Sequence, residues 1–247
     1  MLLKFKVIIA SLIAKISNQI FILSNKSQGV TCPICQIQLK KFKYYDEHNS
    51  YCPRCGSLSR HRALALIYQQ KLGRTFPKGH KKILQFAAEK YIIDMMDNDG
   101  HEYKTADFED PSQIGSHYLE GRDILADMTN MHNIEDSRFD VVIAFDVLEH
   151  IKEDIKAIKE LNRILIKDGV FCFSVPIQRE HTHEYLEGEN KGDPDHVRSC
   201  GFDYIERFKK YGFDIEIISL TEETPTNLLY DLKSSEHHPE IYICKIN

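Results

Sequence analysis

Four cysteines near the start of the chain have the spacing of a metal site. They form two Cys-Pro-x-Cys pairs, Cys32 with Cys35 and Cys52 with Cys55, and sixteen residues separate the pairs. Each pair can turn two thiolates towards one point, so that together they offer the tetrahedral sulfur ligands that Zn²⁺ prefers. A redox dithiol and an iron centre are the alternatives, but two matched Pro-containing pairs fit a redox motif poorly. Because four protein sulfurs leave no open coordination position, we expect a structural Zn²⁺ ion in a small zinc ribbon.

The charges of the chain are divided much as its cysteines are. The 247 residues carry a net charge of −5. Ten of the 32 Lys and Arg residues but two of the 37 Asp and Glu residues lie in residues 1–62, so this segment carries +8 and the remainder −13. The other cysteines, Cys172, Cys200 and Cys244, are scattered singly, which is untypical of a secreted disulfide framework and indicates a reducing compartment. The ordinary composition excludes collagen-like, mucin-like and disordered chains, and the negative total argues against a general nucleic-acid binder.

The chain begins with an apolar segment, residues 1–28, that we expect to form an amphipathic helix. Its apolar residues recur at a spacing of three or four, whereas Lys4, Lys15 and Asn18 can face water. Three interpretations stay open: the helix packs on its own protein or on a second copy, it lies on an anionic membrane surface, or it is a signal or membrane span. Lys15 and the polar run over 17–19 interrupt a span. The apolar positions are Leu2, Phe5, Ile9, Leu12, Ile13, Ile16, Ile20 and Leu23.

A short segment follows the cysteine pairs. We expect the ribbon to cover 29–62 and a linking helix to cover 63–80. Arg60, His61 and Arg62 lie at the start of that helix, where positive charge opposes the helix dipole. These residues indicate either a bound anion, an acidic face of the following domain, or solvated charges beside a domain contact.

The rest of the chain, residues 81–247, alternates short apolar runs with helical patterns. Such alternation is typical of an α/β fold, a doubly wound and mostly parallel seven-stranded sheet covered on both faces. In such sheets a ligand binds beyond the carboxyl ends of the strands, so Asp107 and Asp127, which end two strands, are candidate ligand contacts. We expect helices over 90–96, 151–166 and 204–211. The expected strands cover 83–86, 103–107, 123–127, 139–145, 170–175, 213–218 and 240–245.

Three runs in this domain resemble a known family. They are Arg-Phe-Asp-Val-Val at 138–142, Phe-Asp-Val-Leu-Glu-His-Ile at 145–151, and Glu-Leu-Asn-Arg-Ile-Leu-Ile-Lys-Asp-Gly at 160–169. This pattern is similar to class I S-adenosylmethionine-dependent methyltransferases of the type 11 kind, although Asp168-Gly169 stands where the family usually has Pro-Gly-Gly. With the cysteine pairs and a late Asp-His-Val-Arg at 195–198, the chain resembles a subgroup that carries an N-terminal zinc ribbon.

The resemblance implies a Rossmann-like fold with S-adenosyl-L-methionine as cofactor. Asp107 would then hold the ribose hydroxyls, and Asp127 with the Met128 backbone would face the adenine edge. Phe145 would border the methyl donor, and Asp146 would lie near the amino-acid end of the cofactor. The adjacent Glu-His pair at 149–150 would either fix this loop or take part in catalysis.

The first motif of the chain departs from the family pattern. Where the family has a glycine-rich turn, this chain has Phe86, Ala87, Ala88 and Glu89. Alanine disfavours positive φ, so we expect either a different turn or a shifted cofactor. The subgroup often carries Ala-Pro-Glu here, which makes this turn a variant of that motif.

Methyl transfer to a hydroxyl group needs a base, and a polar segment near 178–198 offers three histidines. His196 is the first candidate, because Asp195 and Arg198 could set its tautomer and charge; His183 and His181 follow. Arg198 could also bind an anionic group of the acceptor. Because the segment is long for a connection, we expect an acceptor-binding lid.

The sequence therefore predicts a cytoplasmic transferase, with peripheral contact to the inner membrane surface through residues 1–25 as an option. We expect methyl transfer, at oxygen, to a small-molecule or glycan-type acceptor. Two alternatives stay open. One is a non-catalytic member of the fold that uses its ribbon as a binding module, and the other is a protein or RNA methyltransferase docked through the basic ribbon. The acidic second part of the chain fits RNA poorly, so we expect no nucleic-acid partner.

Overall fold

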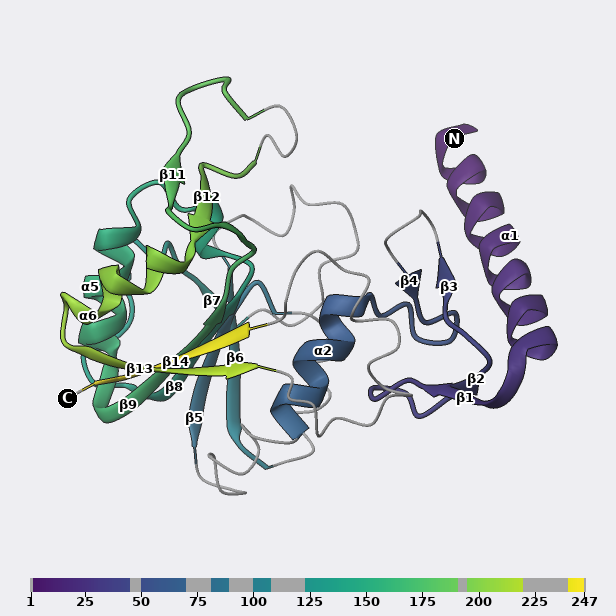
Figure 1. Cartoon of the computed structure of the whole chain (residues 1–247), viewed down its shortest axis with the longest axis horizontal. Helices are drawn as coiled ribbons and strands as arrows, with labels where there is room; N and C mark the ends of the chain where they lie inside the picture. Colours follow the sequence, from purple (N-terminus) through teal and green to yellow (C-terminus); the bar gives the residue numbers. More distant parts are fainter. Residues whose placement is uncertain are drawn as a thin grey trace. The chain divides into compact units, whose positions relative to one another are not determined.

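The computed structural model describes residues 2–44, 50–69, 81–88, 100–107, 123–190, 195–219 and 240–246. These residues form two compact units, which are drawn together in Figure 1. The first unit extends to Tyr68, and the second contains the described residues from Gln69 to Ser219 together with 240–246.

The first unit consists of a long helix and a small set of paired strands. Helix α1 (Leu2–Asn25) forms as expected from a run free of Gly and Pro. β1 (Lys26–Thr31) pairs with β2 (Gln38–Leu39), and β3 (Lys43–Tyr44) pairs with β4 (Ser50–Tyr51), both antiparallel. We call residues 26–44 and 50–58 the ribbon. Its small core contains Val30, Leu39, Phe42, Cys32 and Cys52.

One side of α1 is attached to the ribbon. Lys43 Nζ donates hydrogen bonds to Ser17 Oγ at 2.8 Å and Asn18 Oδ1 at 3.0 Å, and Tyr51 OH donates to Asn18 Oδ1 at 2.9 Å. Ile22 packs against the ribbon core. Figure 1 shows α1 running beside β3 and β4, as these contacts require.

The basic start of α2 (Ser59–Ile67) stabilises the first unit itself. Arg62 is buried and donates to the Ser57 carbonyl at 2.6 Å and to Ser50 Oγ at 2.8 Å, and its guanidinium lies 4.0 Å from the centre of the Phe42 ring. His61 Nδ1 accepts the backbone N–H at the helix N-cap, Leu58. These contacts within the unit correct the expectation that Arg62 binds an anion or is solvated.

The second unit contains a seven-stranded sheet of order β13-β14-β9-β8-β5-β6-β7. Strand β14 is antiparallel to both of its neighbours, and the other adjacent pairs are parallel. The chain runs from β5 outwards to β6 and β7, then returns to β8 on the other side of β5, which places a topological switch point between β5 and β8. The strands are β5 (Lys82–Phe86), β6 (Glu102–Asp107), β7 (Ile124–Leu125), β8 (Phe139–Phe145), β9 (Leu165–Ser174), β13 (Phe213–Ser219) and β14 (Glu240–Ile246).

Both faces of this sheet are buried, so its strands are apolar at consecutive positions. Leu84, Val142 and Phe173 face a core that includes α5 (Asp154–Ile164), η3 (Phe202–Ile205) and α6 (Glu206–Lys209). The adjacent positions Ile83 and Ile143 are also buried, on the opposite face. This burial confirms the predicted doubly wound sheet. Within the core, Phe173 stacks on Phe208 at 4.7 Å and on Tyr242 at 5.0 Å between ring centres.

Around β8 and β9 the structure differs from the expected elements in two ways, and α2 begins at Ser59, where the linking helix was expected to begin at residue 63. Strand β9 begins at Leu165, five residues before the expected start, because Asp168 and Gly169 lie inside the strand as an irregular step, with Asp168 at φ +62°. The helix expected over 151–166 is shorter in the structure. It covers only Asp154–Ile164 (α5) and follows the 3₁₀ turn η2 (Leu148–His150). The expected helix over 90–96 and Glu89 lie outside the described residues.

The polar segment predicted to be a lid contains a small sheet of its own. Strand β12 (Arg198–Gly201) lies between β10 (Ile177–Arg179), to which it is parallel, and β11 (His183–Glu184), to which it is antiparallel. All four residues of β12 are buried. The described residues of this segment are therefore folded into strands, and the role of the segment as an acceptor-binding lid stays a prediction.

Candidate functional site

The four ribbon cysteines lie together, as their spacing predicts. Their ligand atoms all lie within 4.8 Å of one another, with Sγ–Sγ distances of 3.8 Å for Cys32–Cys55 and 3.6 Å for Cys35–Cys52. Four sulfurs bound to Zn²⁺ at about 2.3 Å are separated by about 3.8 Å in a tetrahedron. The cluster therefore has the donor type and the spacing of a closed zinc site.

The two cysteine pairs form matching turns. Gln36 N–H donates to the Cys32 carbonyl at 2.9 Å, and Gly56 N–H donates to the Cys52 carbonyl at 2.8 Å. The residue after each second cysteine has a left-handed backbone, with φ +59° at Gln36 and +81° at Gly56. Glycine adopts this conformation without steric cost, whereas Gln36 adopts it with a side chain present. The hydroxyl of buried Ser57 lies 3.2 Å from Cys55 Sγ.

The four cysteine thiols differ in the direction in which their pKa values are shifted. Hydrogen bonds with Cys35 and Cys52 lower the pKa of Cys32 to about 6, and the hydrogen bond with Cys32 holds the pKa of Cys55 below its ordinary value. Hydrogen bonds with Cys32 raise the pKa values of Cys35 and Cys52. The cluster therefore contains readily formed thiolates, which are the species that bind metals.

A second candidate site lies at the carboxyl edge of the sheet, around the switch point. Four neighbouring strands end there in Phe86, Asp107, Leu125 and Phe145. Because the carboxyl ends of parallel strands meet at one edge, the predicted cofactor residues of these strands share that edge. The polar residues Asp107 and Asp146 lie at or directly after a strand end, where the hydrogen bonds of the sheet fix the position of the backbone.

The turn after β5 adopts a conformation that glycine would favour. Ala87 has φ +46°, and its N–H donates to the Ala106 carbonyl at 3.1 Å. A left-handed alanine costs about 1–2 kcal/mol, which the flanking strand pairing must offset. The chain therefore keeps a left-handed residue at this turn without glycine, which corrects the expectation of a different turn at this position. Phe86 is buried beneath the turn, and Ala88 follows, half-buried.

The acidic residues of the edge differ in how they are held. Asp107 is half-buried at the end of β6, and its carbonyl accepts the Ala126 N–H at 3.0 Å. Asp127 Oδ1 accepts both the backbone N–H and the hydroxyl of Thr129, each at 2.8 Å, so this carboxylate shapes its own turn. Met128 beside it is buried.

The end of β8 mirrors the end of β5. Asp146 follows Phe145 with φ +53°, and its N–H donates to the Ser174 carbonyl at 3.0 Å. The Ser174 hydroxyl donates to Asp146 Oδ1 at 2.9 Å. The two strands at the switch point thus end in similar left-handed turns.

The three predicted catalytic histidines do not form one group. His183 Nε2 lies 2.7 Å from Glu189 Oε1, and His181 Nδ1 lies 3.6 Å from Asp203 Oδ2, both on the exposed surface. The Thr182 hydroxyl and backbone N–H donate to Asp203 and lower the pKa of this carboxyl below its ordinary value. His183 thus lies in β11 and His181 in the connection between β10 and β11, each beside an acidic partner.

His196 joins residues that sequence reasoning did not connect with it. Its ring packs edge-on against His150, with centres 4.6 Å apart, and the ligand atoms of Glu149, His150 and His196 lie within 4.8 Å of one another. Asp195 contributes its carbonyl oxygen, which lies 2.9 Å from His150 Nδ1. The adjacent Glu-His pair after β8 was visible in the sequence, but no spacing rule links it to His196.

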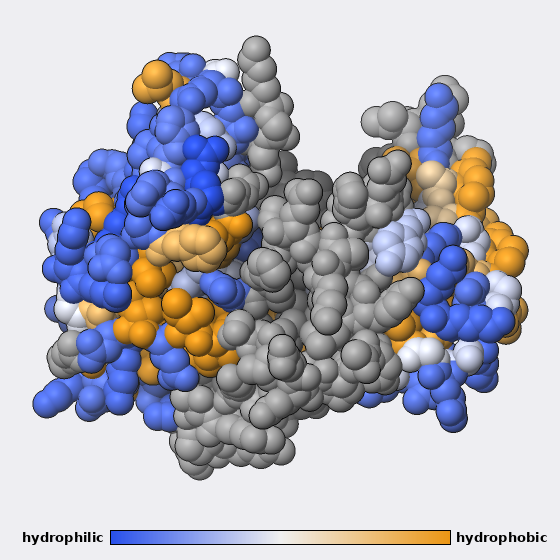
Figure 2. All heavy atoms as spheres, in the orientation of Figure 1, coloured by the Kyte–Doolittle hydropathy of each residue, from blue (hydrophilic) through white to orange (hydrophobic). Residues whose placement is uncertain are grey.

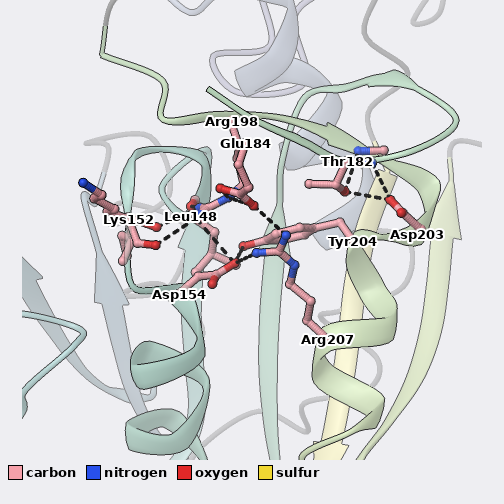
Figure 3. A network of polar contacts seen from close by, with 11 residues as sticks. Leu148, Lys152, Asp154, Thr182, Glu184, Arg198, Asp203, Tyr204 and Arg207 are labelled. Atoms are coloured by element: carbon pink, nitrogen blue, oxygen red, sulfur yellow. Dashed lines mark hydrogen bonds and ion pairs between the residues drawn. The ribbon is translucent and has the colours of Figure 1, made fainter. Parts of the chain in front are cut away.

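Arg198 is buried within the fold, which corrects its predicted roles. Its Nη1 donates to the carbonyls of Leu148 at 2.6 Å and Ile151 at 2.7 Å, and its Nη2 donates to that of Lys152 at 3.1 Å (Figure 3). Its Nε donates to Glu184 at 3.1 Å. Because these donors are all engaged inside the domain, Arg198 fastens β12 to η2 and the start of α5.

A buried carboxylate completes this network. Asp154 Oδ2 accepts the Tyr204 hydroxyl at 3.0 Å and also pairs with Arg207 (Figure 3). Arg207 in turn reaches Glu184. Burial alone would raise the pKa of Glu184, but hydrogen bonds from Arg198 and Arg207 outweigh it and lower that pKa.

Comparisons with known proteins agree with this fold. Residues 85–173 match the family model of a methyltransferase domain. No curated protein sequence matches the chain. A SAM-dependent methyltransferase from Archaeoglobus fulgidus superposes with a TM-score of 0.52 at 13% identity, covering 73% of this chain and 92% of its own. The second unit therefore has the fold of class I methyltransferases, and we call it the methyltransferase domain below.

Two further structures extend this comparison. A methyltransferase from Mesorhizobium loti has a TM-score of 0.51 at 13% identity, covering 72% of this chain and 96% of its own. The [4+2]-cyclase SpnF has a TM-score of 0.52 at 14% identity, covering 83% of this chain and 85% of its own. At such low identity these likenesses show the fold of the methyltransferase domain, and the reaction has to be argued from the residues of this chain.

Proposed function

We propose that this protein is an S-adenosylmethionine-dependent methyltransferase that methylates an oxygen atom of a small-molecule or glycan-type acceptor. The supporting observation is the carboxyl edge of the sheet at its switch point. There two left-handed turns, at Ala87 and Asp146, bring backbone close to the position where this fold binds a ligand. The same edge carries the carboxylates of Asp107 and Asp127.

The residues of the edge fit the cofactor chemically. Asp107 would accept hydrogen bonds from the two ribose hydroxyls, which are strong because the acceptor is ionised. Asp127, already oriented by Thr129, and Met128 would face the adenine. Phe145 would border the methyl donor, and Asp146, fixed by Ser174, would lie at the amino-acid end. When bound, S-adenosylmethionine supplies an electrophilic methyl group on sulfur.

The chain's own contribution to chemistry is positioning and proton removal. A hydroxyl acceptor has to lose its proton as its oxygen is methylated, and a histidine is the usual base near neutral pH. His196 is the candidate that supports oxygen methylation best, because it lies beside η2, which begins three residues after β8 ends. The net charge of −13 over residues 63–247 favours an acceptor other than nucleic acid.

Calorimetric titration with S-adenosylmethionine and S-adenosylhomocysteine tests the cofactor assignment. We expect Asp107→Ala to weaken binding of both ligands about 10- to 100-fold, the effect of losing hydrogen bonds to a charged acceptor. Asp214→Ala is the matched control, because Asp214 is an exposed carboxylate near the start of β13, at the opposite edge of the sheet. Absence of binding to folded parent protein would refute the function, and unchanged affinity in Asp107→Ala would refute the ribose assignment.

We further propose that the four-cysteine cluster binds one structural Zn²⁺. The fit of the sulfur spacing to a tetrahedral site supports this, as do the two matching turns that orient the cysteines. The ion would hold the ribbon together, and the closed set of ligands leaves it no catalytic position.

We also propose that α1 lies on an anionic membrane surface. The segment Lys6–Asn25 is apolar and long enough to cross a membrane by length and composition, with a mean hydropathy of 1.8. The side of α1 opposite the ribbon is uncovered in the structure, and Figure 2 shows apolar side chains along it. The uncovered residues are Ile9, Leu12, Ile13, Ile16, Ile20 and Leu23, which are 43–77% exposed.

Two features favour a surface position over a span. Ser17 and Asn18 bond to Lys43 and Tyr51, so the ribbon occupies one side of the helix, which lipid would have to surround in a span. The first 62 residues carry +8, and this positive charge complements anionic lipid headgroups. An apolar stripe flanked by basic residues is the usual form of an interfacial helix.

Sedimentation with vesicles tests this proposal. We expect full-length protein to bind vesicles that contain phosphatidylglycerol and to bind purely phosphatidylcholine vesicles more weakly. Ile16→Glu with Ile20→Glu should abolish binding, whereas Gln19→Glu, a control on the flank of the same helix, should weaken it only slightly. Equal binding by the double variant would refute the proposal. So would a concentration-dependent dimer that the double variant disrupts, because a second copy would then cover the stripe.

A further inference from the structure

Three side chains near the carboxyl edge form a second cluster with metal-binding chemistry. The ligand atoms of Glu149, His150 and His196 lie within 4.8 Å of one another. Two of these residues come from η2 and the third from the segment before β12, which is distant in sequence. Glu149 is buried, His196 is half-buried and His150 is exposed, so the cluster extends from the domain interior to its surface.

The two segments that carry the cluster are bonded to each other. Val197 N–H donates to the Glu149 carbonyl at 2.9 Å, and Arg198 Nη1 donates to the Leu148 carbonyl at 2.6 Å. Figure 3 shows Arg198 reaching Leu148 from β12. These bonds fix the position of His196 relative to η2 through the backbone, as a preformed site requires.

The hydrogen bonding of His150 suits a metal ligand. Its Nδ1 lies 2.9 Å from the Asp195 carbonyl oxygen, and a carbonyl can only accept, so Nδ1 carries the proton. A neutral His150 then has its free lone pair on Nε2. Histidines that bind metals characteristically donate their other N–H to a carbonyl or carboxylate, which fixes the tautomer and the ring orientation.

From these contacts we propose that Glu149, His150 and His196 bind one divalent transition-metal cation, of the Mn²⁺, Fe²⁺, Co²⁺ or Zn²⁺ class. Two imidazoles with one carboxylate form a ligand set for such cations that leaves coordination positions open. The four-cysteine cluster has no such position. The cation would therefore be able to bind an exogenous oxygen ligand.

The position of the cluster gives this cation a role, which rests on the proposed methyltransferase function. η2 begins three residues after Phe145, the residue assigned to the methyl donor. A cation bound there would hold the acceptor oxygen and lower the pKa of its hydroxyl. In this arrangement the cation replaces His196 as the group that activates the hydroxyl, because the lone pair of His196 is bound to it. The hydroxyl proton passes to solvent, a lone pair of the oxygen forms the new bond to the methyl carbon, and the electrons of the broken C–S bond return to sulfur.

Manganese binding provides the test, because Mn²⁺ prefers nitrogen and oxygen ligands over the thiolates of the ribbon. Full-length protein whose ribbon is already loaded with Zn²⁺ is titrated with Mn²⁺, and free Mn²⁺ is followed by electron paramagnetic resonance. We expect one Mn²⁺ per chain and at least a 10-fold loss of affinity in Glu149→Gln and in His196→Ala. His132→Ala is the control, since His132 is an exposed histidine of the same domain outside the cluster, and it should bind like the parent.

Parallel titrations with S-adenosylhomocysteine separate this proposal from the proposed function. We expect His196→Ala to bind S-adenosylhomocysteine like the parent while losing Mn²⁺. Parent protein that binds S-adenosylhomocysteine but no Mn²⁺ would overturn the cation site alone. Mn²⁺ binding that survives both Glu149→Gln and His196→Ala would overturn the ligand assignment. If Glu149→Gln does not fold, His196→Ala, which changes a half-buried side chain, still decides the question.

Discussion

The ribbon and the carboxyl edge of the methyltransferase domain are built from the same local device. In each region two turns place a residue in the left-handed conformation: Gln36 and Gly56 in the ribbon, and Ala87 and Asp146 at the edge. In the ribbon each turn is closed by a hydrogen bond between neighbours in sequence. At the edge each turn is tied to the next strand, as Asp146 is to Ser174.

This difference separates a structural metal site from a site that binds and releases a ligand. The ribbon turns have little other structure around them, and the four sulfurs they present fill a coordination sphere completely. The edge turns belong to a sheet that is stable through its own core, so their conformation does not depend on a bound ligand. Removing the ligand should therefore unfold the first region and leave the second intact.

Removal of the metal is expected to give the largest effect. Binding of Zn²⁺ by four thiolates is worth about 10–16 kcal/mol in comparable small sites, more than the stability of a fold as small as the ribbon. Chelation should therefore unfold the ribbon, while the sheet of the methyltransferase domain stays folded. Hydrogen exchange resolved by peptide measures this, with loss of protection expected over residues 26–58 and retained protection over β5, β8 and β9.

Two variants sharpen the same comparison. Cys52→Ala should lose the metal and reproduce the exchange pattern of the chelated protein. Cys200→Ala changes a buried cysteine outside the cluster and should retain about one zinc per chain by metal analysis. If chelation left protection of the ribbon unchanged, the proposed role of the four cysteines would be wrong.

Substitution of Arg198 is expected to have the next largest effect, on the stability of the methyltransferase domain. Arg198→Met leaves the carbonyls of Leu148, Ile151 and Lys152 without their donor in a buried setting. We expect the free energy of unfolding of the methyltransferase domain to fall by about 3–5 kcal/mol, as when one partner of a buried charged network is removed. Chemical denaturation followed by tyrosine fluorescence or circular dichroism measures this fall.

The control for this prediction is another arginine of the small sheet. Arg179 is exposed in β10, so Arg179→Met should change stability by no more than about 0.5 kcal/mol. Equal effects of the two substitutions would show that Arg198 is not the fastening residue. A loss in Arg198→Met confined to acceptor binding, with stability unchanged, would return Arg198 to the binding role first predicted for it.

The sheet and the cysteine cluster could be predicted because their signals are local. Strands buried on both faces are continuous apolar runs, as in Phe139–Phe145, and the Cys-Pro-x-Cys spacing alone brings two thiolates together. The acids at the ends of β6 and β7 follow from the same pattern. Their roles towards a cofactor remain predictions.

The features that were predicted wrongly or missed from the sequence depend on contacts between segments that are distant in the chain. Nothing local distinguishes buried Arg198 from an exposed arginine, because its partners are carbonyls left open at η2 and the start of α5. The cluster of Glu149, His150 and His196 depends on the same docking of β12 against η2. The conformation of Ala87 was misjudged for another reason, since a cost of about 1–2 kcal/mol discourages a left-handed alanine without forbidding it.

The smallest expected effect concerns Ala87, and it compares the left-handed turn after β5 directly with the left-handed turn at Gly56 in the ribbon. Ala87→Gly should stabilise the methyltransferase domain by up to about 1 kcal/mol, because relief of the left-handed strain exceeds the added freedom of the unfolded chain. Ala88→Gly, at the next position, where φ is not positive, should instead destabilise by about 0.4–1 kcal/mol. Gly56→Ala in the ribbon should destabilise, since the substitution introduces the strain that Ala87 already bears. Thermal and chemical denaturation measure all three, and a destabilising Ala87→Gly would mean that the left-handed turn after β5 carries no strain to relieve.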